Sequence, residues 1–597
     1  MLILVMGVTG SGKTTVGVRL AARLGLPFYD ADDFHPPENR AKMAQNLALD
    51  DADRWPWLER ISEASVEWER GGGAVLACSA LKRAYRQALF RRVSRSRVVY
   101  LELARATIEQ RLEARRGHHE IVVAYDKILD GQFRDLEAPA EAIAVPGTLV
   151  PAEIVERAAR QLAREGMTPR GRVHFAEGAR DAAIGAERTR ELVTELLAAL
   201  GPMRRLLLVP PDATRAHSGA GELASLIFGA LRGRTHVDVL PALGTHRPMT
   251  DAEIGAMFPG IPRDRFLVHD FRGELTTLGE VPASFVCDVS AGLCDYDVPC
   301  QLNPALTDGG YDRILSIGQL VPHEVVGIAG HDKNLLVGAG GKQVIDRSHF
   351  LGAACGMERI MGRVSTPVRD VLSYMGAQFL SSLPITHLLT VRERAAGGTL
   401  VTRGLFAGDD QACYFAGAPL ARDCNVKLVP EPLAKVVVYL DPAEYRSTWL
   451  GNKAIYRTRM ALGDGAELLV LAPGVSSFGE DPEIDRLIRR HGYRGTASTL
   501  AATRADPELA GTLSAAAHLI HGSSEGRFSI RYAAGALRAE ELRGVGYESA
   551  DLGAALARYD PRSLADGMNQ LPDGERVFFV SNPALGLWAE RGRFEAT

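Results

Sequence analysis

A glycine-rich loop between an apolar run and an amphipathic segment constrains the fold of this chain more than any other feature. The sequence MLILVMGVTGSGKTT carries GxxxxGKT at residues 7–14, directly after the apolar residues Leu2–Met6. In this context backbone N–H groups and a helix start bind phosphates, a lysine reaches the β- and γ-phosphate oxygens, and a hydroxyl ligates Mg²⁺. We therefore predict an ATP and Mg²⁺ site, with Lys13 catalytic and Thr14 also a metal ligand. The predicted phosphate-binding residues are Gly7, Gly10, Gly12, Lys13, Thr14 and Thr15.

Length and composition bound the class of protein. The 597 residues suggest three to four domains, and a net charge of -4 without a basic stripe argues against nucleic acid as a partner. The apolar start is too short to span a bilayer and lacks the positive flank of a signal peptide, and no run approaches the length of a membrane span. Seven cysteines without a CxxC motif fit reduced thiols. We expect a cytoplasmic protein with no membrane partner.

The order of apolar runs predicts an α/β protein in three parts. Short β-rich runs at residues 2–6, 75–78 and 98–103 alternate with helical segments, as in a parallel sheet. VPAEIVERAARQLAREG reads as a closing amphipathic helix and MTPRGR as a linker. A second α/β pattern begins at RRLLLVPPD, and AKVVVYLDP and AELLVLAPG indicate a third α/β lobe. The predicted domains are residues 1–166, 172–430 and 431–597.

Acidic and basic residues follow the glycine-rich loop. FYDADDFHPPENRAKM carries Asp30, Asp32 and Asp33 after a strand-like segment, where one carboxylate could take a proton from a hydroxyl and another could hold a metal-bound water. From spacing alone, a solvated turn explains this cluster equally well. Later segments supply five cations, the last two of which are four residues apart and share a helix face: Arg54, Lys82, Arg86, Arg111 and Arg115.

Segments in the first part resemble, in order, the signatures of the gluconokinase family of small P-loop kinases. They are residues 30–43, 51–58 and 78–86 and the sequence GQFRDLEAP, and the resemblance covers residues 1 to about 165. It implies transfer of the γ-phosphoryl group of ATP to the 6-hydroxyl of D-gluconate. By this resemblance Asp32 is the candidate base and Asp30 lies nearer Mg²⁺. The implied substrate-binding residues are Asp30, His35, Arg54, Lys82, Arg111 and Arg115.

The rest of the chain carries histidines and lysines at loop-like positions beside glycines. The informative segments are PPDATRAH, ALGTHRPMT, VPHEVVGIAGHDKNLLVGAGGKQVIDRSHF and STWLGNKAIYR. Each histidine alone is explained more readily by a structural role than by a catalytic one. No histidine pair has the local spacing of a zinc site, and Cys287, Cys294 and Cys300 match no common metal-binding pattern.

Together these segments resemble the nickel-dependent lactate racemase family over about residues 172–597. The core of the resemblance is His323, Lys333 ten residues later and His349 sixteen residues further. It implies that Lys333 carries a nickel-pincer nucleotide, whose sulfur arms hold nickel, and that His349 ligates the nickel. An imidazole together with sulfur in a planar ligand set suits Ni(II). The resemblance also implies that His246 and His323 act as opposed acid and base groups, and that the enzymes that build the cofactor are partners.

Three further positions match the same family, and two more depart from it. Asp212 and Arg215 fall on the family's DxTR motif and are implied to bind the cofactor, and Lys453 matches a lysine near the substrate. Trp449, a candidate substrate contact, and Leu450 replace more polar residues of lactate-specific members, which argues against lactate. The sequence also reads GHDK where the family has GGRK before its lysine.

The two resemblances suggest that one sugar acid is the substrate of both parts of the chain, which would phosphorylate its 6-hydroxyl and invert its C2. Removing the C2 hydrogen of a 2-hydroxy acid as a proton is costly beside a carboxylate, and a cofactor that accepts hydride avoids that charge. Inversion at C2 interconverts D-gluconate and D-mannonate, so our leading hypothesis is an epimerase fused to a gluconate kinase. Two alternatives stay open: a non-catalytic module that senses sugar acids, or a racemase for an unrelated 2-hydroxy acid. The sequence leaves open the oligomeric state, a homo-oligomer included.

Overall fold

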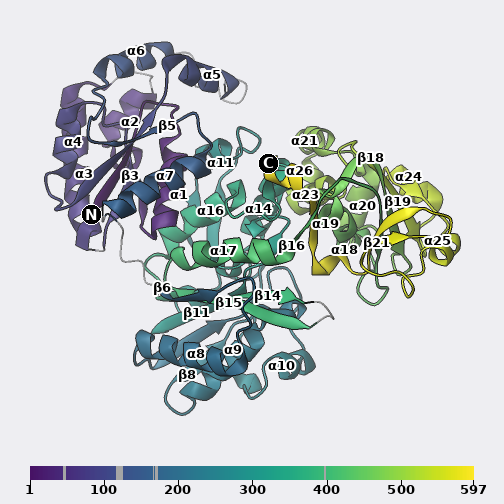
Figure 1. Ribbon diagram of the computed structural model, residues 1–597. Coiled ribbons are helices and arrows are strands. Elements are labelled where there is room, and N and C mark those ends of the chain that lie inside the picture. The colour runs from purple at the N-terminus through teal and green to yellow at the C-terminus, as the bar shows by residue number, and fades with distance from the viewer. Residues whose placement is uncertain are drawn as a thin grey trace.

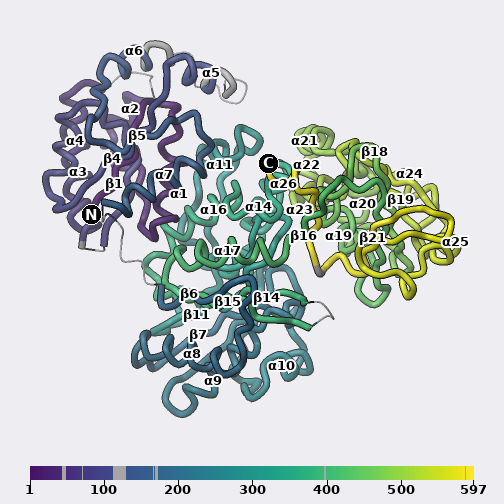
Figure 2. Tube along the Cα trace, viewed as in Figure 1, coloured from purple at the N-terminus to yellow at the C-terminus, as the bar shows by residue number. Residues whose placement is uncertain are grey.

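The computed structural model describes residues 1–44, 49–70, 72–115, 125–165, 167, 173–395 and 399–596. Three large β-sheets, each with helices around it, follow one another along the chain (Figure 1). Figure 2 traces the chain from the purple N-terminal part through the teal central part to the yellow C-terminal part. The predicted α/β class is therefore confirmed. Each of the three predicted domain ranges holds one large sheet, and the exact boundaries stay a prediction.

The first sheet contains five parallel strands. The strands are β1 (Leu2–Met6), β2 (Phe28–Asp30), β3 (Ala74–Ala77), β4 (Ser96–Glu102) and β5 (Ile143–Pro146). They lie in the order β2-β3-β1-β4-β5. The helices are α1 (Lys13–Leu24), the 3-10 turn η1 (Ala31–Phe34), α2 (Pro37–Ala44), α3 (Asp51–Arg70), α4 (Arg83–Phe90), α5 (Arg105–Arg115), α6 (Tyr125–Asp135) and α7 (Pro151–Arg164).

The local sequence explains why β1 leads into α1. All five residues of β1 are buried, as the central strand of a parallel sheet with helices on both faces requires. Gly12 begins α1 with φ +88°, a conformation that a residue with a Cβ adopts only under strain, and Gly25 ends the helix with φ +64°. The turn therefore aims the N-terminus of α1 at the space beyond the carboxyl end of β1.

The second sheet contains six strands from the central part of the chain. The strands are β6 (Val173–Gly178), β7 (Arg205–Val209), β8 (His236–Val239), β11 (Arg313–Gln319), β14 (Ile385–Arg394) and β15 (Leu400–Gly408). Their order is β6-β15-β14-β11-β7-β8. Strands β14, β11, β7 and β8 pair in parallel, whereas β15 is antiparallel to both of its neighbours, β14 and β6. Two short antiparallel pairs accompany it: β9 (Thr276–Val281) with β10 (Val298–Leu302), and β12 (Pro322–His323) with β13 (Gly327–Ile328).

Helices and turns of the central part surround this sheet. They are α8 (Ala186–Leu200), η2 (Ala213–Ser218), α9 (Ala220–Leu231), α10 (Asp251–Met257), η3 (Arg263–Arg265), α11 (Ala283–Val289), α12 (Pro304–Thr307), α13 (Asp332–Leu336), α14 (Lys342–Ala354), α15 (Met357–Ile360), α16 (Pro367–Met375), the π-helical turn η4 (Gly376–Leu380) and α17 (Ala412–Asn425). Helices α14, α16 and α17 lie between the second sheet and the other two parts of the molecule (Figure 1).

The third sheet forms the C-terminal lobe. Its strands are β17 (Leu433–Tyr439), β18 (Leu462–Ala472), β19 (Ser529–Ala534), β20 (Glu548–Ser549), β21 (Gly567–Gln570) and β22 (Arg576–Val580), in the order β20-β19-β18-β17-β22-β21. β16 (Val426–Val429) pairs with β23 (Leu587–Glu590). The helices and turns are α18 (Thr448–Gly451), α19 (Lys453–Thr458), α20 (Pro482–His491), α21 (Thr496–Ala505), α22 (Pro507–Gly511), α23 (Leu513–His521), α24 (Ala539–Gly544), α25 (Leu552–Arg558), η5 (Pro583–Leu585) and α26 (Arg591–Ala596). Among the described residues, no helix has the length and apolar character needed to cross a bilayer.

Helix α1 contacts the central part of the chain as well as its own sheet. Arg19 of α1 forms an ion pair with Asp370 of α16. Gln378 of η4 donates its side-chain amide to the backbone carbonyl of Phe28 in β2. The ring of Phe28 also lies 6.5 Å from that of Tyr374. Charged, polar and aromatic contacts therefore join the helix that follows the glycine-rich loop to α16 and η4.

Helix α16 also contacts the segment that leads into α13. Arg369, next to Asp370, donates to the backbone carbonyls of Ile328 and Gly330, at 2.5 and 3.4 Å. Helix α13 begins two residues after Gly330 and carries Lys333 in its first turn. One helix thus contacts both α1 and the backbone beside Lys333.

Two candidate active sites

The glycine-rich loop has the conformation that a phosphate site needs. Gly10 and Gly12 have φ values of +78° and +88°, and a Cβ at Gly7 would lie 2.6 Å from the Ser11 hydroxyl. The ammonium of Lys13 lies 3.1 Å from the carbonyl oxygen of Val8, to which it donates. Burial lowers the pKa of Lys13, although Asp32 and Asp30 act in the opposite direction. The loop therefore holds a partly buried cation that an anionic ligand would stabilise.

Thr14 and Asp30 form a candidate Mg²⁺ site. The Thr14 hydroxyl, at the start of α1 beside Thr15, donates to Asp30 Oδ2 at 2.9 Å. The other carboxylate oxygen of Asp30 accepts from the backbone N–H of Asp32 at 3.1 Å. Burial and the nearby Asp32 raise the pKa of Asp30, so the ionised carboxylate lacks a full counter-charge. A hydroxyl and a carboxylate oxygen are ligands that suit Mg²⁺.

Asp32 and His35 lie together at the end of β2. The Asp32 side chain is 75% exposed, and its Oδ1 lies 3.8 Å from His35 Nε2. His35 is buried and stacks on Trp57, with 4.3 Å between the ring centroids. Burial, aided by the charges of Arg40 and Arg54, lowers the pKa of His35 to about 4, so the ring is neutral at neutral pH. An open carboxylate beside a fixed neutral imidazole suits contact with a polyhydroxy substrate.

Two predicted cations, Lys82 and Arg54, meet in a hydrogen-bond network, and Arg54 is close enough to His35 for its charge to act on the pKa of that ring. A third predicted cation lies elsewhere. Lys82 donates to Asp51 Oδ1 at 2.9 Å, and the Tyr85 hydroxyl donates to the same carboxylate oxygen. Arg54 donates to the Tyr85 hydroxyl at 3.0 Å. Arg111 instead donates to the carbonyl of Gly147 at 2.7 Å, after β5.

The remaining predicted cations of this part have other positions. Arg86 is buried and donates to the carbonyls of Ala80, Leu81 and Glu137, which fixes the backbone after β3. The side chain of Arg115 lies outside the described residues.

The predicted second site gathers the buried His323 and the partly buried Lys333 and His349 where the central part meets the C-terminal lobe. His323 lies in β12, Lys333 in α13 and His349 in α14. Burial, and next to it the charge of Lys333, lowers the pKa of His323 well below its ordinary value and also lowers that of His349. Burial and Arg215 lower the pKa of Lys333 to about 8. The charges of these groups are thus close enough to act on one another.

Hydrogen bonds fix the tautomers of the three predicted histidines. His323 Nδ1 accepts from the backbone N–H of Val325 at 3.1 Å, so its proton resides on Nε2. His349 Nδ1 donates to the Ile345 carbonyl at 2.6 Å, which leaves Nε2 with a free lone pair. His246, whose side chain is 47% exposed, pairs through Nδ1 with a carboxylate oxygen of Asp212 at 2.7 Å. His246 Nε2 is therefore a proton acceptor, while His323 Nε2 is a donor.

The residues of the DxTR segment and of α18 and α19 border the same site. Asp212 accepts from Thr214 at 2.6 Å as well as from His246, and these bonds hold its pKa below its ordinary value although burial raises it. Arg215 acts on the pKa of Lys333 and of Lys453, whose own pKa burial lowers. The ring of Trp449 lies against that of His518, with 4.5 Å between the ring centroids and a tilt of 31° between the ring planes.

The structure adds residues to this site that the sequence did not indicate. Glu324, next to His323, is contacted by Arg457 at 3.5 Å, and Arg457 also donates to the carbonyl of Pro322. His521, buried in α23, is close enough to Glu324 and His349 for their charges to act on its pKa. Adjacency to His323 in VPHEVVG was the one sequence signal for Glu324. Arg457 and His521 come from the C-terminal lobe, and only the fold brings them to the site.

Comparison with known proteins finds a different relative for each part of the chain. Residues 9–135 match the family model of shikimate kinase, and residues 192–359 match that of the lactate racemase N-terminal domain. A gluconokinase of Gluconobacter oxydans is 38% identical over 167 residues, 27% of this chain and 92% of the relative. A thermosensitive gluconokinase of Escherichia coli is 39% identical over 137 residues, 23% of this chain and 71% of the relative.

The rest of the chain has a solved structural relative. The lactate racemase apoprotein of Thermoanaerobacterium thermosaccharolyticum aligns with a TM-score of 0.50 and 16% identity, over 69% of this chain and 91% of that one. This similarity establishes a shared fold. Both resemblances seen in the sequence are thereby confirmed.

Proposed function

The chain belongs through its N-terminal part to the gluconokinase family, and from that premise we propose a bifunctional enzyme of sugar-acid metabolism. Its first site phosphorylates D-gluconate at the 6-hydroxyl with ATP. Its second site inverts C2 of a 2-hydroxy sugar acid and interconverts D-mannonate and D-gluconate. The opposite tautomers of His246 and His323, the second of which is close enough to the partly buried Lys333 to feel its charge, are the observation that carries the second activity.

In the first site, positioning and charge do most of the work of phosphoryl transfer. Lys13 exchanges the Val8 carbonyl for phosphate oxygens, and Thr14 and Asp30 hold Mg²⁺. Asp32, open to solvent, takes the proton of the attacking 6-hydroxyl. Lys82 binds the carboxylate of the sugar acid by exchanging its Asp51 partner.

The residues of the second site fit a nickel-pincer nucleotide. Lys333 is near its pKa at neutral to mildly basic pH, so a neutral amine is available for covalent attachment. His349 keeps Nε2 free for a metal, because its Nδ1 donates to a backbone carbonyl, as metal-bound histidines commonly do. When bound, this group supplies a hydride acceptor. We therefore propose that the second activity depends on nickel.

The protein's own contribution at C2 is the handling of protons. His246 Nε2 accepts the proton of the 2-hydroxyl from one face, and Asp212 stabilises the imidazolium that results. His323 Nε2, which carries a proton, donates it on the opposite face. Lys453 and Arg215 supply positive charge for the substrate carboxylate.

The two activities share D-gluconate, which explains why one chain would carry both. An inversion at C2 is nearly balanced because the two epimers differ at one carbon. Phosphorylation by ATP is strongly downhill and removes gluconate as it forms. The fused chain would thus convert mannonate to 6-phosphogluconate, and the cofactor-building enzymes would be its partners.

Deuterium at C2 tests the second activity directly. Full-length, cofactor-loaded protein is given C2-deuterated D-gluconate without ATP, and the products are followed by NMR. We expect D-mannonate that retains deuterium, since hydrogen moves as hydride and not through solvent. Mannonate whose deuterium has exchanged with water would contradict the hydride route. Absence of mannonate would favour a sensing module or a racemase for another acid, which a panel of 2-hydroxy acids would separate.

Asp212→Asn tests the proton relay. An amide can no longer stabilise a charged His246 or fix its tautomer, so we expect the rate of C2 inversion to fall about 100-fold. Phosphorylation of added gluconate should not change. The matched control is Asp238→Asn, which alters a His–Asp pair at 3.0 Å with His236 in the same part of the chain. Equal losses in both variants would mean that Asp212 has only a structural role.

A further inference from the structure

Four neighbouring side chains at the second site take no part in the handling of protons at C2. Glu324 lies in the turn between β12 and β13, Tyr456 and Arg457 lie in α19, and His521 is the last residue of α23. The Tyr456 hydroxyl is 3.4 Å from Glu324 Oε1, and the guanidinium of Arg457 is 3.5 Å from Glu324 Oε2. The rings of Tyr456 and His521 have 6.0 Å between their centroids. We call these four residues the Glu324 cluster.

The Glu324 cluster lies beside the residues proposed to act at C2. Glu324 follows His323 in the chain, and its Oε2 is 3.8 Å from His323 Nδ1. Its charge also acts on the pKa of three other residues of the site, which are Lys333, His349 and Lys453. A substrate whose C2 lies at His323 therefore has Glu324 within reach of its remaining carbons.

The Glu324 carboxylate keeps capacity to accept hydrogen bonds. Neighbouring positive charge holds the pKa of Glu324 well below its ordinary value although burial raises it, so the group is ionised and offers about four acceptor positions. Tyr456 and Arg457, at 3.4 and 3.5 Å, lie beyond the usual range of about 2.5–3.2 Å. His323 Nδ1 has no proton to donate, because it accepts from the backbone N–H of Val325. A ligand that donates short hydrogen bonds would therefore stabilise this carboxylate.

Two nitrogens of the same cluster lack a hydrogen-bond partner in the part of the chain that the structure describes. Arg457 donates to the carbonyl of Pro322 through one terminal nitrogen, while its buried Nε has no partner. His521 is 6% exposed, and its Nε2 has no partner either. Because buried polar groups in folded proteins are almost always hydrogen-bonded, these two nitrogens indicate a polar ligand.

The chemistry of the cluster suits neutral hydroxyl groups. A hydroxyl can donate to Glu324 and at the same time accept from Arg457, so a chain that carries several of them satisfies both charges. An alkyl chain would leave these groups unpaired, which a site built for hydroxyls penalises strongly. A second carboxylate on the substrate would be repelled by Glu324.

From this arrangement we propose that the Glu324 cluster binds the hydroxyl groups on the carbons beyond C2 of the substrate. It thereby selects polyhydroxy acids over 2-hydroxy acids with an alkyl chain or a second carboxylate. The inference rests on the proposed second activity and names the residues that set its substrate class. Glu324 and Arg457 determine specificity and move no proton at C2.

Glu324→Gln, measured with two ligands of equal chain length, tests the proposal. Full-length, cofactor-loaded protein inverts D-gluconate, and 2-hydroxyhexanoate, which lacks the further hydroxyls, is added as a competitor. We expect the variant to raise KM for gluconate about 10- to 100-fold, since bonds to a charged group are lost. The inhibition constant of 2-hydroxyhexanoate should change less than about threefold. Equal changes in both constants would mean that Glu324 is only structural, and would overturn the proposal.

The matched control is Glu358→Gln. Glu358 pairs with Arg459 at 2.8 Å and, like Glu324 with Arg457, joins the central part to the C-terminal lobe. This variant should leave the ratio of the two constants unchanged. A shift in that ratio as large as that of Glu324→Gln would show that any loosening between the two parts changes specificity, and would overturn the proposal.

Calorimetry separates failure of the cluster from failure of the proposed activity. D-gluconate should bind the wild type at two sites, and Glu324→Gln should weaken one of them at least about tenfold. In the wild type itself, malate and 2-hydroxyhexanoate should bind at least about tenfold more weakly than gluconate does at that site. Two gluconate sites without inversion at C2 would contradict the activity and still support the cluster. A single gluconate site in the wild type, or two sites unchanged in Glu324→Gln, would overturn the cluster.

Discussion

Replacing Lys13 by alanine is expected to lower kcat for gluconate phosphorylation by about 10³-fold or more while the protein stays folded. The charge that Lys13 stabilises develops as the phosphoryl group moves, and cations at such positions contribute about 10³–10⁵-fold. Its interaction within the protein is a hydrogen bond to the Val8 carbonyl, and burial already lowers its pKa, so its loss should cost little stability. A coupled assay of 6-phosphogluconate formation measures the rate.

The matched control lies at the other end of the same helix. Arg23 forms an exposed ion pair with Glu156 at 2.7 Å, and Arg23→Ala should change kcat less than about twofold. Near-normal phosphorylation by Lys13→Ala would remove the glycine-rich loop from the mechanism. An equal loss in both variants would mean that α1 tolerates no substitution.

Replacing Lys333 by alanine is expected to abolish C2 inversion and leave the kinase rate unchanged. Lys333 is partly buried and close enough to Arg215, Glu324 and His323 for their charges to interact, and its lowered pKa suits covalent attachment of a cofactor. Without the amine the cofactor has no anchor, so nickel content should fall with activity. Intact-protein mass spectrometry adds a direct readout: the cofactor-sized mass increase of the wild type should be absent from the variant.

Lys342→Ala is the control for this prediction. Lys342 pairs with Asp346 in α14, nine residues after Lys333, and its side chain is partly exposed. It should keep the mass increase, the nickel and the inversion. A Lys333→Ala protein that still carries the covalent group would show that another residue anchors it.

Local patterns explain how much of the fold could be predicted. β1 and α1 follow from five apolar residues, a glycine turn and an amphipathic run, each within a few residues of the next. The closing helix α7, whose apolar face is buried, was equally readable. The contact between Arg19 and Asp370 was not, because 351 residues separate them and an ion pair leaves no periodic signal.

The same distinction holds for the sites. His323, Lys333 and His349 stand in one segment whose spacing resembles a known family, so they could be named from the sequence. Their tautomers could not, because the bonds that fix them are made to backbone groups whose positions depend on the fold.

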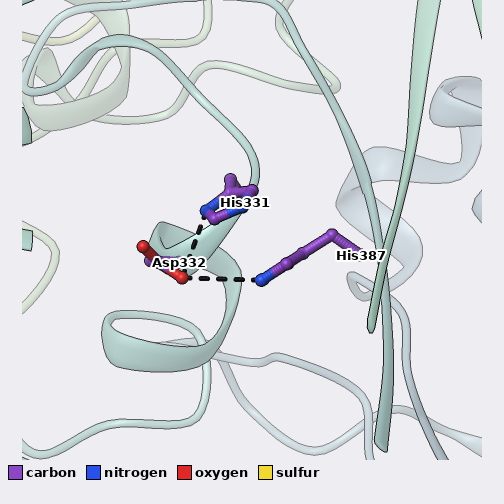
Figure 3. A group of neighbouring side chains, drawn as sticks. All are labelled: His331, Asp332 and His387. Atoms are coloured by element: carbon purple, nitrogen blue, oxygen red, sulfur yellow. Dashed lines mark ion pairs between the residues drawn. The ribbon is translucent and has the colours of Figure 1, made fainter. Parts of the chain in front are cut away.

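A buried group of three neighbouring side chains, His331, Asp332 and His387, marks the limit of sequence analysis most clearly (Figure 3). His331 and Asp332 were visible as a departure from a family pattern, without a role. His387 lies more than fifty residues later on β14, and strand pairing in the central sheet, not local spacing, brings it to them.

Conversion of D-mannonate tests the central claim, that one chain carries two activities that share gluconate. Full-length, nickel-loaded protein is incubated with D-mannonate, ATP and Mg²⁺, and the products are identified by NMR and mass spectrometry. We expect 6-phosphogluconate from the wild type, a mixture of mannonate and gluconate from Lys13→Ala, and unchanged mannonate from His246→Ala. Mixing the two variants should restore 6-phosphogluconate, because each keeps the site that the other lacks. Mannonate left untouched by a nickel-loaded protein that phosphorylates added gluconate would contradict the claim.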